Sequence, residues 1–273
     1  MKYILITGAC GGLANNYINK IKSDNYYIFA LDFNSMITTM YNDANIFGIV
    51  CDVTNEESVV LAFNAIANIT TKIDFIVNFA GIISIGALVE HNYNQFKHVF
   101  DVNLHGTFLI NKYAFSFVKE AKGMIINISS EYGIFSAVPF NSAYSISKHA
   151  LENYNDALRR ELKCYGIKVI KIRLGAFKTN MSASIIDKFN DLLKNSLYYK
   201  RVYNKMKKMM LNELKRAKDP SLAANLLYRV MNKKKPRIAY NLNISKKMLL
   251  LSSLPEEIQD TIYSLYFDEK NRR

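Results

Sequence analysis

Tyr3-Ile-Leu-Ile-Thr7 runs directly into Gly8-Ala-Cys-Gly-Gly12-Leu-Ala14 near the start of the chain. The apolar, β-branched part predicts a buried strand, and helical spacing begins at the last glycines. Glycine at such a turn lets the backbone approach a pyrophosphate, and the helix N-terminus offers it free N–H groups and a positive dipole end. The stretch therefore predicts dinucleotide contacts at Gly8, Gly12 and Leu13. A glycine-rich turn can also be only a turn, so the later strands must decide.

Further apolar runs recur along the first two thirds of the chain, each bounded by polar or glycine residues. They lie at 27–32, 46–52, 73–78, 124–129 and 168–173. Stretches with helical spacing separate them, and one follows the capping box Thr54-Asn-Glu-Glu57. Alternating strands and helices predict an α/β fold: a Rossmann-type doubly wound parallel sheet in three layers, α/β/α, with ligands at the carboxyl ends of the strands.

The order of elements changes after about residue 180. We expect a long basic helix over 182–218, a helix over 221–232, an edge strand over 238–242 and short helices over 248–254 and 255–266. Because this part lacks the alternating order, we predict one domain over 1–273. Residues 1–180 would form the dinucleotide-binding and catalytic core, and residues 181–273 a helical elaboration that covers the substrate.

Length, hydropathy and cysteine content narrow the class of protein. The chain has 273 residues, of which 50% are hydrophobic, enough for a sizeable core. Its first apolar run is too short for a secretory signal or a membrane span. Cys10, Cys51 and Cys164 show neither a C-x-x-C pair nor metal-ligand spacing, so we expect buried reduced thiols, no metal and a cytoplasmic location.

The positive charge is concentrated in the last third of the chain. Residues 181–273 hold 20 Lys and Arg against 9 Asp and Glu, whereas residues 1–180 hold 16 against 14. Such an excess indicates a membrane surface, an acidic ligand or nucleic acid, or only a solvated lysine-rich face. The apolar run Met248–Leu251 beside it favours peripheral membrane contact as one hypothesis. The lysine-rich segment 205–218 has no recognised nucleic-acid motif, so no nucleic-acid partner is expected.

Acidic residues end the second and third predicted strands. Asp32 lies about twenty residues beyond the glycine turn, where a carboxylate can bind adenosine ribose hydroxyls and repel a 2′-phosphate. No Lys or Arg stands at positions 10, 11 or 33, so NAD is favoured over NADP. Asp52, followed by Val53, would border the adenine. As alternatives, Asp32 could be a turn residue and Asp52 part of a helix entry.

Tyr144 and Lys148 are four residues apart on a predicted helix that begins near Ser142, so they face the same place. The predicted strand before this helix ends in Ser129-Ser130. A phenol with a pKa near 10 is a poor base at neutral pH. A positive charge about 4 Å away is worth about 4 kcal/mol at an effective dielectric near 20, or about 3 pKa units. We therefore expect Lys148 to lower the pKa of Tyr144 towards that of a general base.

Six motifs in order resemble those of the short-chain dehydrogenase/reductase family. They are T-G-A-C-G-G-L-A, N-F-A-G, D-V-N-L-H-G, N-I-S-S, Y-S-I-S-K and R-L-G-A-F-K-T, beginning at residues 7, 78, 101, 127, 144 and 173. The resemblance implies that Tyr144 is the acid/base, Ser130 holds the substrate oxygen, Lys148 binds the nicotinamide ribose and Asn103 anchors a proton-relay water. It also implies cofactor contacts at Asn78, Ala80, Gly81, Tyr144, Gly175 and Thr179.

Three positions depart from the family pattern. Ala14 replaces the third glycine of T-G-x-x-x-G-x-G, and Leu174 stands where proline is usual. The interval from Ser130 to Tyr144 is one residue longer than expected, which leaves Ser129 as a minor alternative to Ser130. The spacing of Gly8, Gly11 and Ala14 also fits the extended branch that acts on sugar nucleotides, but the chain length and N-F-A-G argue against it.

The motifs predict hydride transfer between NAD and a secondary alcohol or ketone. P-F-N-S-A-Y, A-L-R-R-E-L and L-P-E-E-I-Q-D resemble the branch of hydroxysteroid and retinol dehydrogenases, which implies a steroid-, retinoid- or lipid-like substrate. We expect its pocket to lie among residues 81–88, 132–140 and 181–210. The resemblance further implies a homodimer or homotetramer formed through the helices over 105–119 and 142–164. The alternative is a cofactor-binding regulator or scaffold without turnover.

Overall fold

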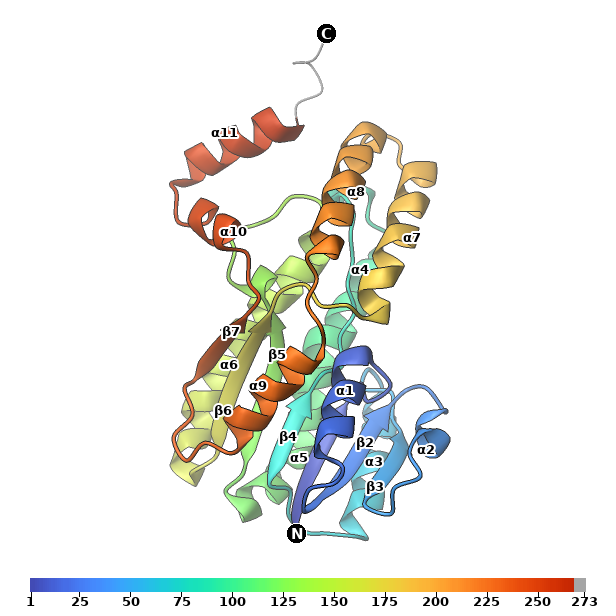
Figure 1. The fold of residues 1–273 in the computed structure, drawn as a ribbon, viewed down its shortest axis with the longest axis vertical. Helices are drawn as coiled ribbons and strands as arrows, with labels where there is room; N and C mark the ends of the chain where they lie inside the picture. Colours follow the sequence, from blue (N-terminus) through green and yellow to red (C-terminus); the bar gives the residue numbers. More distant parts are fainter. Residues whose placement is uncertain (268–273) are drawn as a thin grey trace.

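The computed structural model describes residues 1–267, apart from the side chains of residues 142 and 180–183. Seven strands form a parallel sheet in the order β3-β2-β1-β4-β5-β6-β7 (Figure 1). They are β1 (Lys2–Thr7), β2 (Tyr26–Asp32), β3 (Ile46–Val50), β4 (Phe75–Asn78), β5 (Met124–Ser130), β6 (Lys168–Leu174) and β7 (Ala239–Leu242). The strand order reverses between β1 and β4, which opens a ligand-binding crevice at the carboxyl ends of the strands in folds of this kind.

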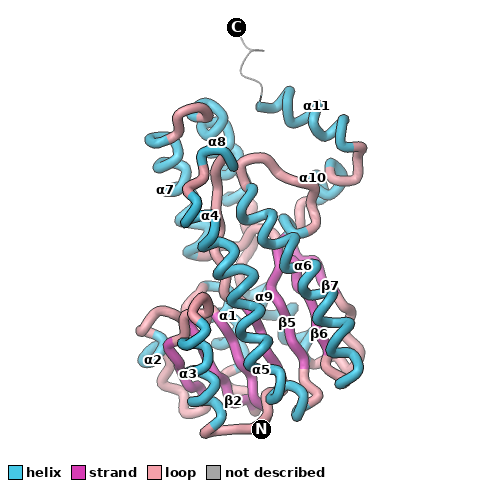
Figure 2. Tube along the Cα trace, turned by 180° about the vertical axis from the view of Figure 1, so that it is seen from behind, coloured by secondary structure: helices cyan, strands magenta, loops and turns pink. Residues whose placement is uncertain are grey.

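Helices cover both faces of the sheet, as Figures 1 and 2 show from opposite sides. One face carries α1 (Gly12–Ile21) and α9 (Ser221–Met231), and the other carries α3 (Glu56–Ala67), α5 (Thr107–Ala121) and α6 (Ser142–Leu162). A short α2 (Ile37–Met40) lies against β3. Successive side chains of β1 enter opposite cores: Ile4 and Ile6 pack on one face and Leu5 on the other. The predicted three-layer Rossmann-type class is confirmed.

The C-terminal helices lie beyond the carboxyl ends of the strands (Figure 1). They are α7 (Asn180–Asn195), α8 (Lys200–Lys215), α10 (Lys246–Leu251) and α11 (Glu256–Phe267), with α4 (Tyr93–Phe100) beside the first two. The predicted single helix over 182–218 is wrong. Two helices, α7 and α8, occupy this range instead. The segment between them is held by Glu90, whose carboxylate accepts hydrogen bonds from Leu197 N at 2.9 Å and Tyr198 N at 2.8 Å. A carboxylate from a distant segment thus binds N–H groups that a continuous helix would use itself.

The predicted capping box is also wrong by one residue. The cap of α3 is Asn55, whose side chain accepts a hydrogen bond from Ser58 N at 3.1 Å. Thr54 is unavailable as the cap because Asp52 Oδ1 accepts from both its N–H and its hydroxyl, at 2.9 and 2.8 Å. The turn before the helix therefore decides where the helix begins.

The buried face of α6 carries polar side chains. Ile146 is 42% exposed, whereas Ser147, Glu152 and Asn155 are buried. Each of these has a partner on a neighbouring element: Asn103, Arg173 and Asn127 respectively.

The expectation of buried cysteines also fails in part, because Cys164 is exposed and Cys10 is half-buried.

Candidate active site

The glycine turn after β1 fits tightly against the end of β4 and the segment after β6. Gly8 has a φ of +66°, and a Cβ there would lie 2.9 Å from Ala80 N, so both conformation and space require glycine. A Cβ on Gly12 would lie 3.2 Å from the Thr179 side chain. The turn thus brings the ends of β1 and β4 together with Thr179, from the segment after β6, at the N-terminus of α1 next to Leu13. We call this glycine turn and the N-terminus of α1 the cradle, because its free N–H groups are the donors that a pyrophosphate would bind.

Asp32 lies at the glycine turn, as predicted. Its carboxylate is 6% exposed and accepts hydrogen bonds from Cys10 N at 2.9 Å and Asn34 N at 3.0 Å. Burial, together with the Asp32 charge, raises the pKa of the Cys10 thiol to about 11. A carboxylate has about four lone-pair sites, so Asp32 can still accept from a ribose hydroxyl. The ribose contact itself stays a prediction.

Asp52 and Val53 both have contacts within the protein that account for their positions. Asp52 is exposed, and its Oδ1 is engaged with Thr54 in the helix entry that was the alternative interpretation. Val53 is buried against η2 (Asp101–Gly106), where a Cβ on Gly106 would lie 2.7 Å from Val53 Cγ2. Contacts of these residues with adenine remain predictions.

Asn78 belongs to a buried ladder of amide side chains. Its Nδ2 donates to Asn111 Oδ1 at 3.0 Å and to Asn127 Oδ1 at 2.8 Å, and Asn127 in turn donates to Asn155 at 2.9 Å. The ladder joins β4, β5, α5 and α6. The side chain of Asn78 therefore fixes the end of β4, next to Ala80 and Gly81. Sequence reasoning missed Asn127, although a polar residue inside an apolar strand signals a buried partner.

Asn103 lies in η2, a single π-helical segment between α4 and α5. Its Oδ1 accepts from Ile82 N at 2.8 Å, and its Nδ2 donates to Ile82 O and to Ser147 Oγ, both at 3.0 Å. A Cβ on Gly81 would lie 3.2 Å from Asn103 Oδ1 and 3.6 Å from Lys148 Nζ. The structure thus brings Gly81, Asn103 and Lys148 together. The amide of Asn103 holds the segment after Gly81, and its link to a relay water stays a prediction.

Ser130, Tyr144 and Lys148 converge beyond the end of β5. The Ser130 hydroxyl is near enough to Tyr144 to lower the pKa of the phenol, and its Oγ donates to Leu174 O at 3.5 Å and accepts from Tyr132 N at 3.3 Å. Lys148 Nζ lies 5.9 Å from the centroid of the Tyr144 ring and donates to Ile128 O at 3.1 Å. Ser129 points elsewhere: its Oγ would lie 3.0 Å from a Cβ on Gly133. Of the two serines, Ser130 is therefore the partner of Tyr144.

Burial drives both Tyr144 and Lys148 towards their neutral forms. It raises the pKa of Tyr144 to about 12, with the Ser130 hydrogen bond opposing and the Glu131 charge adding to the shift. It lowers the pKa of Lys148 to about 8, and the Glu152 charge opposes this. The predicted lowering of the tyrosine pKa is wrong here, because burial outweighs an ammonium group that is directed at Ile128 O. At neutral pH the phenol holds its proton and can serve as a general acid.

Glu131 is a site residue that sequence reasoning missed. It follows Ser130 directly, and its Oε2 accepts a hydrogen bond from Ser245 N at 2.7 Å. Burial raises the pKa of this carboxyl to about 7, with the Ser245 hydrogen bond opposing the shift and Glu213 adding to it. An acidic residue directly after N-I-S-S was the available signal. Glu131 connects the end of β5 to the segment between β7 and α10.

Gly175 is fixed by β7 rather than by the glycine turn. Its N–H donates to Leu242 O at 3.0 Å, and a Cβ there would lie 1.9 Å from Asn243 O. The side chain of Thr179, four residues later, lies next to Gly12 in the glycine turn. The chain between them therefore passes from the edge of the sheet to the cradle at α1. Nicotinamide contacts at Gly175 and Thr179 stay predictions.

The three segments expected to form the substrate pocket pack together in an apolar cluster. It joins residues 81–88, 132–140 and 181–210 and contains Ile83, Ile85, Phe140, Ile185, Phe189, Leu192, Leu193, Tyr199, Tyr203, Met206 and Met210. The ring of Phe140 lies 5.8 Å from that of Tyr203 and 5.2 Å from that of Phe267 in α11. The cluster therefore links the loop before Tyr144 to the C-terminal helices.

Comparison with known proteins identifies the family. A profile described as short chain dehydrogenase matches residues 2–190. The chain is 34% identical over 206 residues to 3-amino-tetrahydro-pyrrolizinone reductase from Xenorhabdus hominickii, covering 73% of this chain and 70% of that protein. It is 29% identical to an NADPH-dependent 1-acyldihydroxyacetone phosphate reductase from Schizosaccharomyces pombe, covering 72% and 68% of the two chains. It is 27% identical to retinol dehydrogenase 7 from Rattus norvegicus, covering 96% and 87%.

Solved structures share the fold at lower identity. A short-chain dehydrogenase from Streptomyces avermitilis matches with a TM-score of 0.75 at 22% identity, over 99% of this chain and 98% of that one. A 3-ketoacyl-(acyl-carrier-protein) reductase from Brucella melitensis, solved with NADH, matches with a TM-score of 0.72 at 17% identity, over 88% and 96%.

The extent of these matches varies among the curated relatives. For five of them, the aligned part spans between 43% and 70% of the relative's own length. The match to retinol dehydrogenase 7 confirms the predicted resemblance to the retinol dehydrogenase branch. Because the profile match covers more than half of the chain, the protein belongs to the short-chain dehydrogenase/reductase family, whose members are oxidoreductases that use nicotinamide dinucleotides.

Proposed function

We propose that this protein reduces a ketone to a secondary alcohol with NADH, using Tyr144 as the proton donor. The observation that carries the proposal is the convergence of Ser130, Tyr144 and Lys148 beyond the end of β5, with Tyr144 in an environment where burial raises its pKa to about 12. A general acid must hold its proton until the substrate oxygen accepts it. The same residues would act in reverse on an alcohol, where loss of the phenol proton is the harder step.

Each residue of the site has a part in this reaction. The Ser130 hydroxyl would donate a hydrogen bond to the carbonyl oxygen, and Tyr144 would transfer its proton to the same oxygen. When bound, the nicotinamide supplies the hydride. Lys148, with a pKa lowered to about 8, can return a proton to Tyr144 near neutral pH and can bind ribose hydroxyls. Asn103 holds the segment after Gly81 beside Lys148.

The preference for NADH rests on Asp32. Its buried carboxylate lies at the glycine turn, where a 2′-phosphate would meet a negative charge. No Lys or Arg stands at positions 10, 11 or 33 to offset that repulsion. Similar proteins are found with either cofactor: the Brucella melitensis reductase was solved with NADH, and the Schizosaccharomyces pombe reductase is NADPH-dependent.

The substrate is expected to be apolar. The cluster around Phe140, Phe189 and Tyr203 lies on segments that flank Gly81 and Tyr144. The loop before Tyr144 is also held by the C-terminal helices, through hydrogen bonds of Ser136 to Ser252 and Gln259. We therefore assign residues 181–273 to a substrate-covering elaboration of one domain. The similarity to retinol dehydrogenase 7 supports a steroid-, retinoid- or lipid-like compound.

Exposed apolar side chains support two kinds of association. Helices α5 and α6 lie on the outer side of the sheet (Figure 2), and Phe108 on α5 and Ile146 on α6 are exposed. We propose that two copies associate through these helices as a dimer or tetramer. Leu250 on α10 and Leu265 on α11 are also exposed, next to a basic part of the chain, and support peripheral membrane contact. Within residues 1–267, no helix combines the length and hydropathy of a membrane span.

The Tyr144→Phe variant tests the proposed reaction. It keeps the ring and removes the transferable proton, so we expect turnover to fall by at least about 100-fold, as for loss of a general acid. Binding of NADH, followed by fluorescence titration, should stay within about twofold of the wild type because the adenosine end is untouched. The same titration with NADPH measures the cofactor preference.

Two outcomes would contradict the proposal. Unchanged ketone reduction by the Tyr144→Phe variant would remove Tyr144 from the chemistry. A wild-type protein that binds NADH but reduces no member of a broad ketone panel would favour the alternative, a cofactor-binding regulator or scaffold. Both measurements use the full chain, and neither requires the natural substrate.

A further inference from the structure

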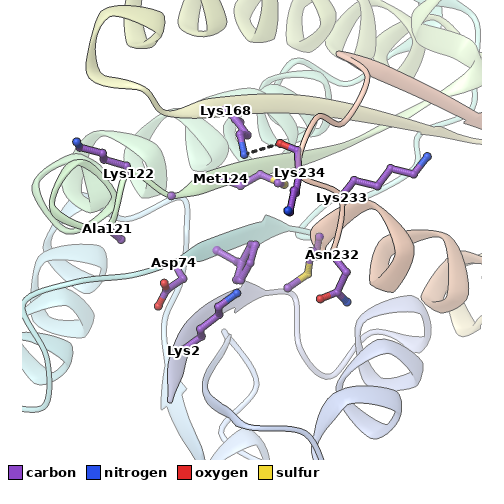
Figure 3. A pocket seen from close by; sticks show the side chains of 12 residues that line it. Lys2, Asp74, Ala121, Lys122, Met124, Lys168, Asn232, Lys233 and Lys234 are labelled. Atoms are coloured by element: carbon purple, nitrogen blue, oxygen red, sulfur yellow. Dashed lines mark hydrogen bonds between the residues drawn. The ribbon is translucent and has the colours of Figure 1, made fainter.

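A lysine-lined cavity lies at the amino end of the sheet, opposite the active site. Its volume is about 300 Å³, at the small end of the usual range for ligand pockets. The lining includes Lys2, Lys122, Lys168, Lys233, Lys234 and one acidic residue, Asp74 (Figure 3). Buried side chains of Phe75, Met124 and Met231 also line it. Five lysines with one carboxylate give the cavity a strong excess of positive charge.

The lysines differ in the direction of their side chains. In Figure 3 the side chains of Lys2, Lys168 and Lys234 face the hollow, whereas those of Lys122 and Lys233 point outward. Lys168 Nζ donates to Lys234 O at 3.1 Å, which fastens the segment between α9 and β7 to the start of β6. Lys233 Nζ lies 5.5 Å from the centroid of the Tyr240 ring. Three ammonium groups therefore surround one small space.

Within residues 1–267, none of the five lysines forms an ion pair, unlike Lys171 with Glu152 or Lys112 with Glu56 elsewhere in the protein. Asp74 is itself engaged, because its Oδ2 accepts from Tyr3 N at 2.9 Å. A cavity lined by charges of one sign concentrates the field and attracts counter-ions. An anionic ligand would neutralise this excess positive charge.

Helix ends explain only some of these lysines. Lys122 and Lys233 follow the C-termini of α5 and α9, where cations are favoured by the helix dipole. Lys2 and Lys168, in contrast, are the first residues of β1 and β6, and no helix end accounts for them. Both face the hollow with Lys234 (Figure 3).

We propose that this cavity binds a small multivalent anion of the oligophosphate class. Lysine ammonium groups are suited to phosphate oxygens, and several negative charges on a compact ligand would match the surplus positive charge. Lys2, Lys168 and Lys234 would contact the ligand, while Lys122 and Lys233 would contribute only to the general field. The site is distinct from the cradle at Gly8, because the two lie at opposite ends of β1.

Calorimetric titration with tripolyphosphate at low ionic strength tests the proposal. Saturating NADH is added first, so that the cradle at Gly8 cannot bind the probe. The double variant Lys2→Gln/Lys234→Gln should weaken binding by at least about tenfold, because it removes two inward-facing charges. The matched control Lys122→Gln/Lys233→Gln removes the same charge from outward-facing positions and should change the Kd by less than about twofold.

The results separate a built site from a general positive field. Selective loss in the Lys2/Lys234 variant, with NADH binding unchanged, supports the proposal. Equal weakening by both double variants would overturn it, because charge alone would then explain the affinity. Absence of binding by the wild-type protein with NADH present would overturn it as well.

Discussion

Glu131 is a titratable carboxyl near Tyr144, the proposed proton donor. Its pKa is raised from 4.5 to about 7 mainly by burial, and its charge in turn raises the pKa of Tyr144. Between pH 4.5 and 7 the folded protein therefore binds more protons at this position than the unfolded chain. The stability contributed by Glu131 is highest at low pH and falls as the pH rises through this window.

The Glu131→Gln variant should remove this pH dependence. An amide cannot ionise, and its oxygen can still accept from Ser245 N, so the variant should be more stable than the wild type at pH 8 by up to about 3 kcal/mol. At pH 4.5 the two proteins should differ little. The free energy of unfolding, measured by denaturant titration at both pH values, checks this.

A matched control is Glu120→Gln, at an exposed position of α5. Its effect on stability should be small and nearly the same at both pH values. If Glu131→Gln also produced a difference that did not change with pH, the carboxyl would not titrate in this window, and its link to the tyrosine would fail.

Among the elements, the junction of β6 with β7 depends on one glycine. A Cβ on Gly175 would lie 1.9 Å from the backbone oxygen of Asn243, which cannot give way as a flexible side chain would. We expect Gly175→Ala to lower the free energy of unfolding by about 1–3 kcal/mol, as overpacking usually does. Hydrogen exchange should quicken more at the β7 amides than in β1, where it should quicken only as far as the global free energy of unfolding falls.

The local pattern of exchange is the decisive measurement for this variant. Equal acceleration in β1 and β7 would indicate a general loss of stability rather than release of β7. An unchanged free energy of unfolding would show that the chain near Asn243 moves aside at no cost. Either result would contradict the role assigned to Gly175.

The sequence predicted the strands of the sheet more accurately than the helices that cover it. Each predicted strand occurs within two residues of its expected bounds, because apolar runs between polar ends report burial directly. The break between α7 and α8 could not be predicted, because Glu90, a residue more than 100 positions earlier, determines it. The polar buried face of α6 was missed for the same reason: its partners lie on β5, β6 and η2.

Candidate site residues were predictable where a motif carries them, and their protonation was not. The structure does bring Gly81, Asn103, Ser130, Tyr144 and Lys148 together. The direction of the tyrosine pKa shift depends on burial and on where the ammonium of Lys148 points, and spacing along a helix contains neither. The effect of Glu131 on the site depends on its burial and on its contact with Ser245 N, which lies far away in the sequence.

The whole molecule separates its functions between the two ends of the sheet. The carboxyl end holds the proposed catalytic residues and the C-terminal helices, and the amino end holds the lysine cavity (Figures 1 and 3). The exposed apolar residues of α10 and α11 are thus on the same end as the proposed substrate site. An apolar substrate dissolved in a bilayer would reach Tyr144 most directly if this end faced the membrane.

Vesicle flotation tests that orientation. On α11, Ile258, Ile262 and Leu265 recur at helical spacing and are exposed, and Leu250 on α10 is 68% exposed. We expect the wild-type protein to float with phosphatidylserine-containing vesicles at low salt and to be released at high salt, because lysine contacts with anionic lipid are screened. The Leu250→Asp/Leu265→Asp variant should lose most of this binding, because apolar insertion is replaced by charge.

The control variant Leu61→Asp/Leu222→Asp carries the same added charge on α3 and α9, at exposed positions away from the C-terminal helices. It should float nearly as well as the wild type, because only the general field is reduced. Equal loss in the two variants would mean that net charge, and not the apolar face of α10 and α11, determines binding. If the wild-type protein fails to float at low salt, the substrate must instead reach Tyr144 from solution, and the exposed leucines would then be available for contact between copies of the protein.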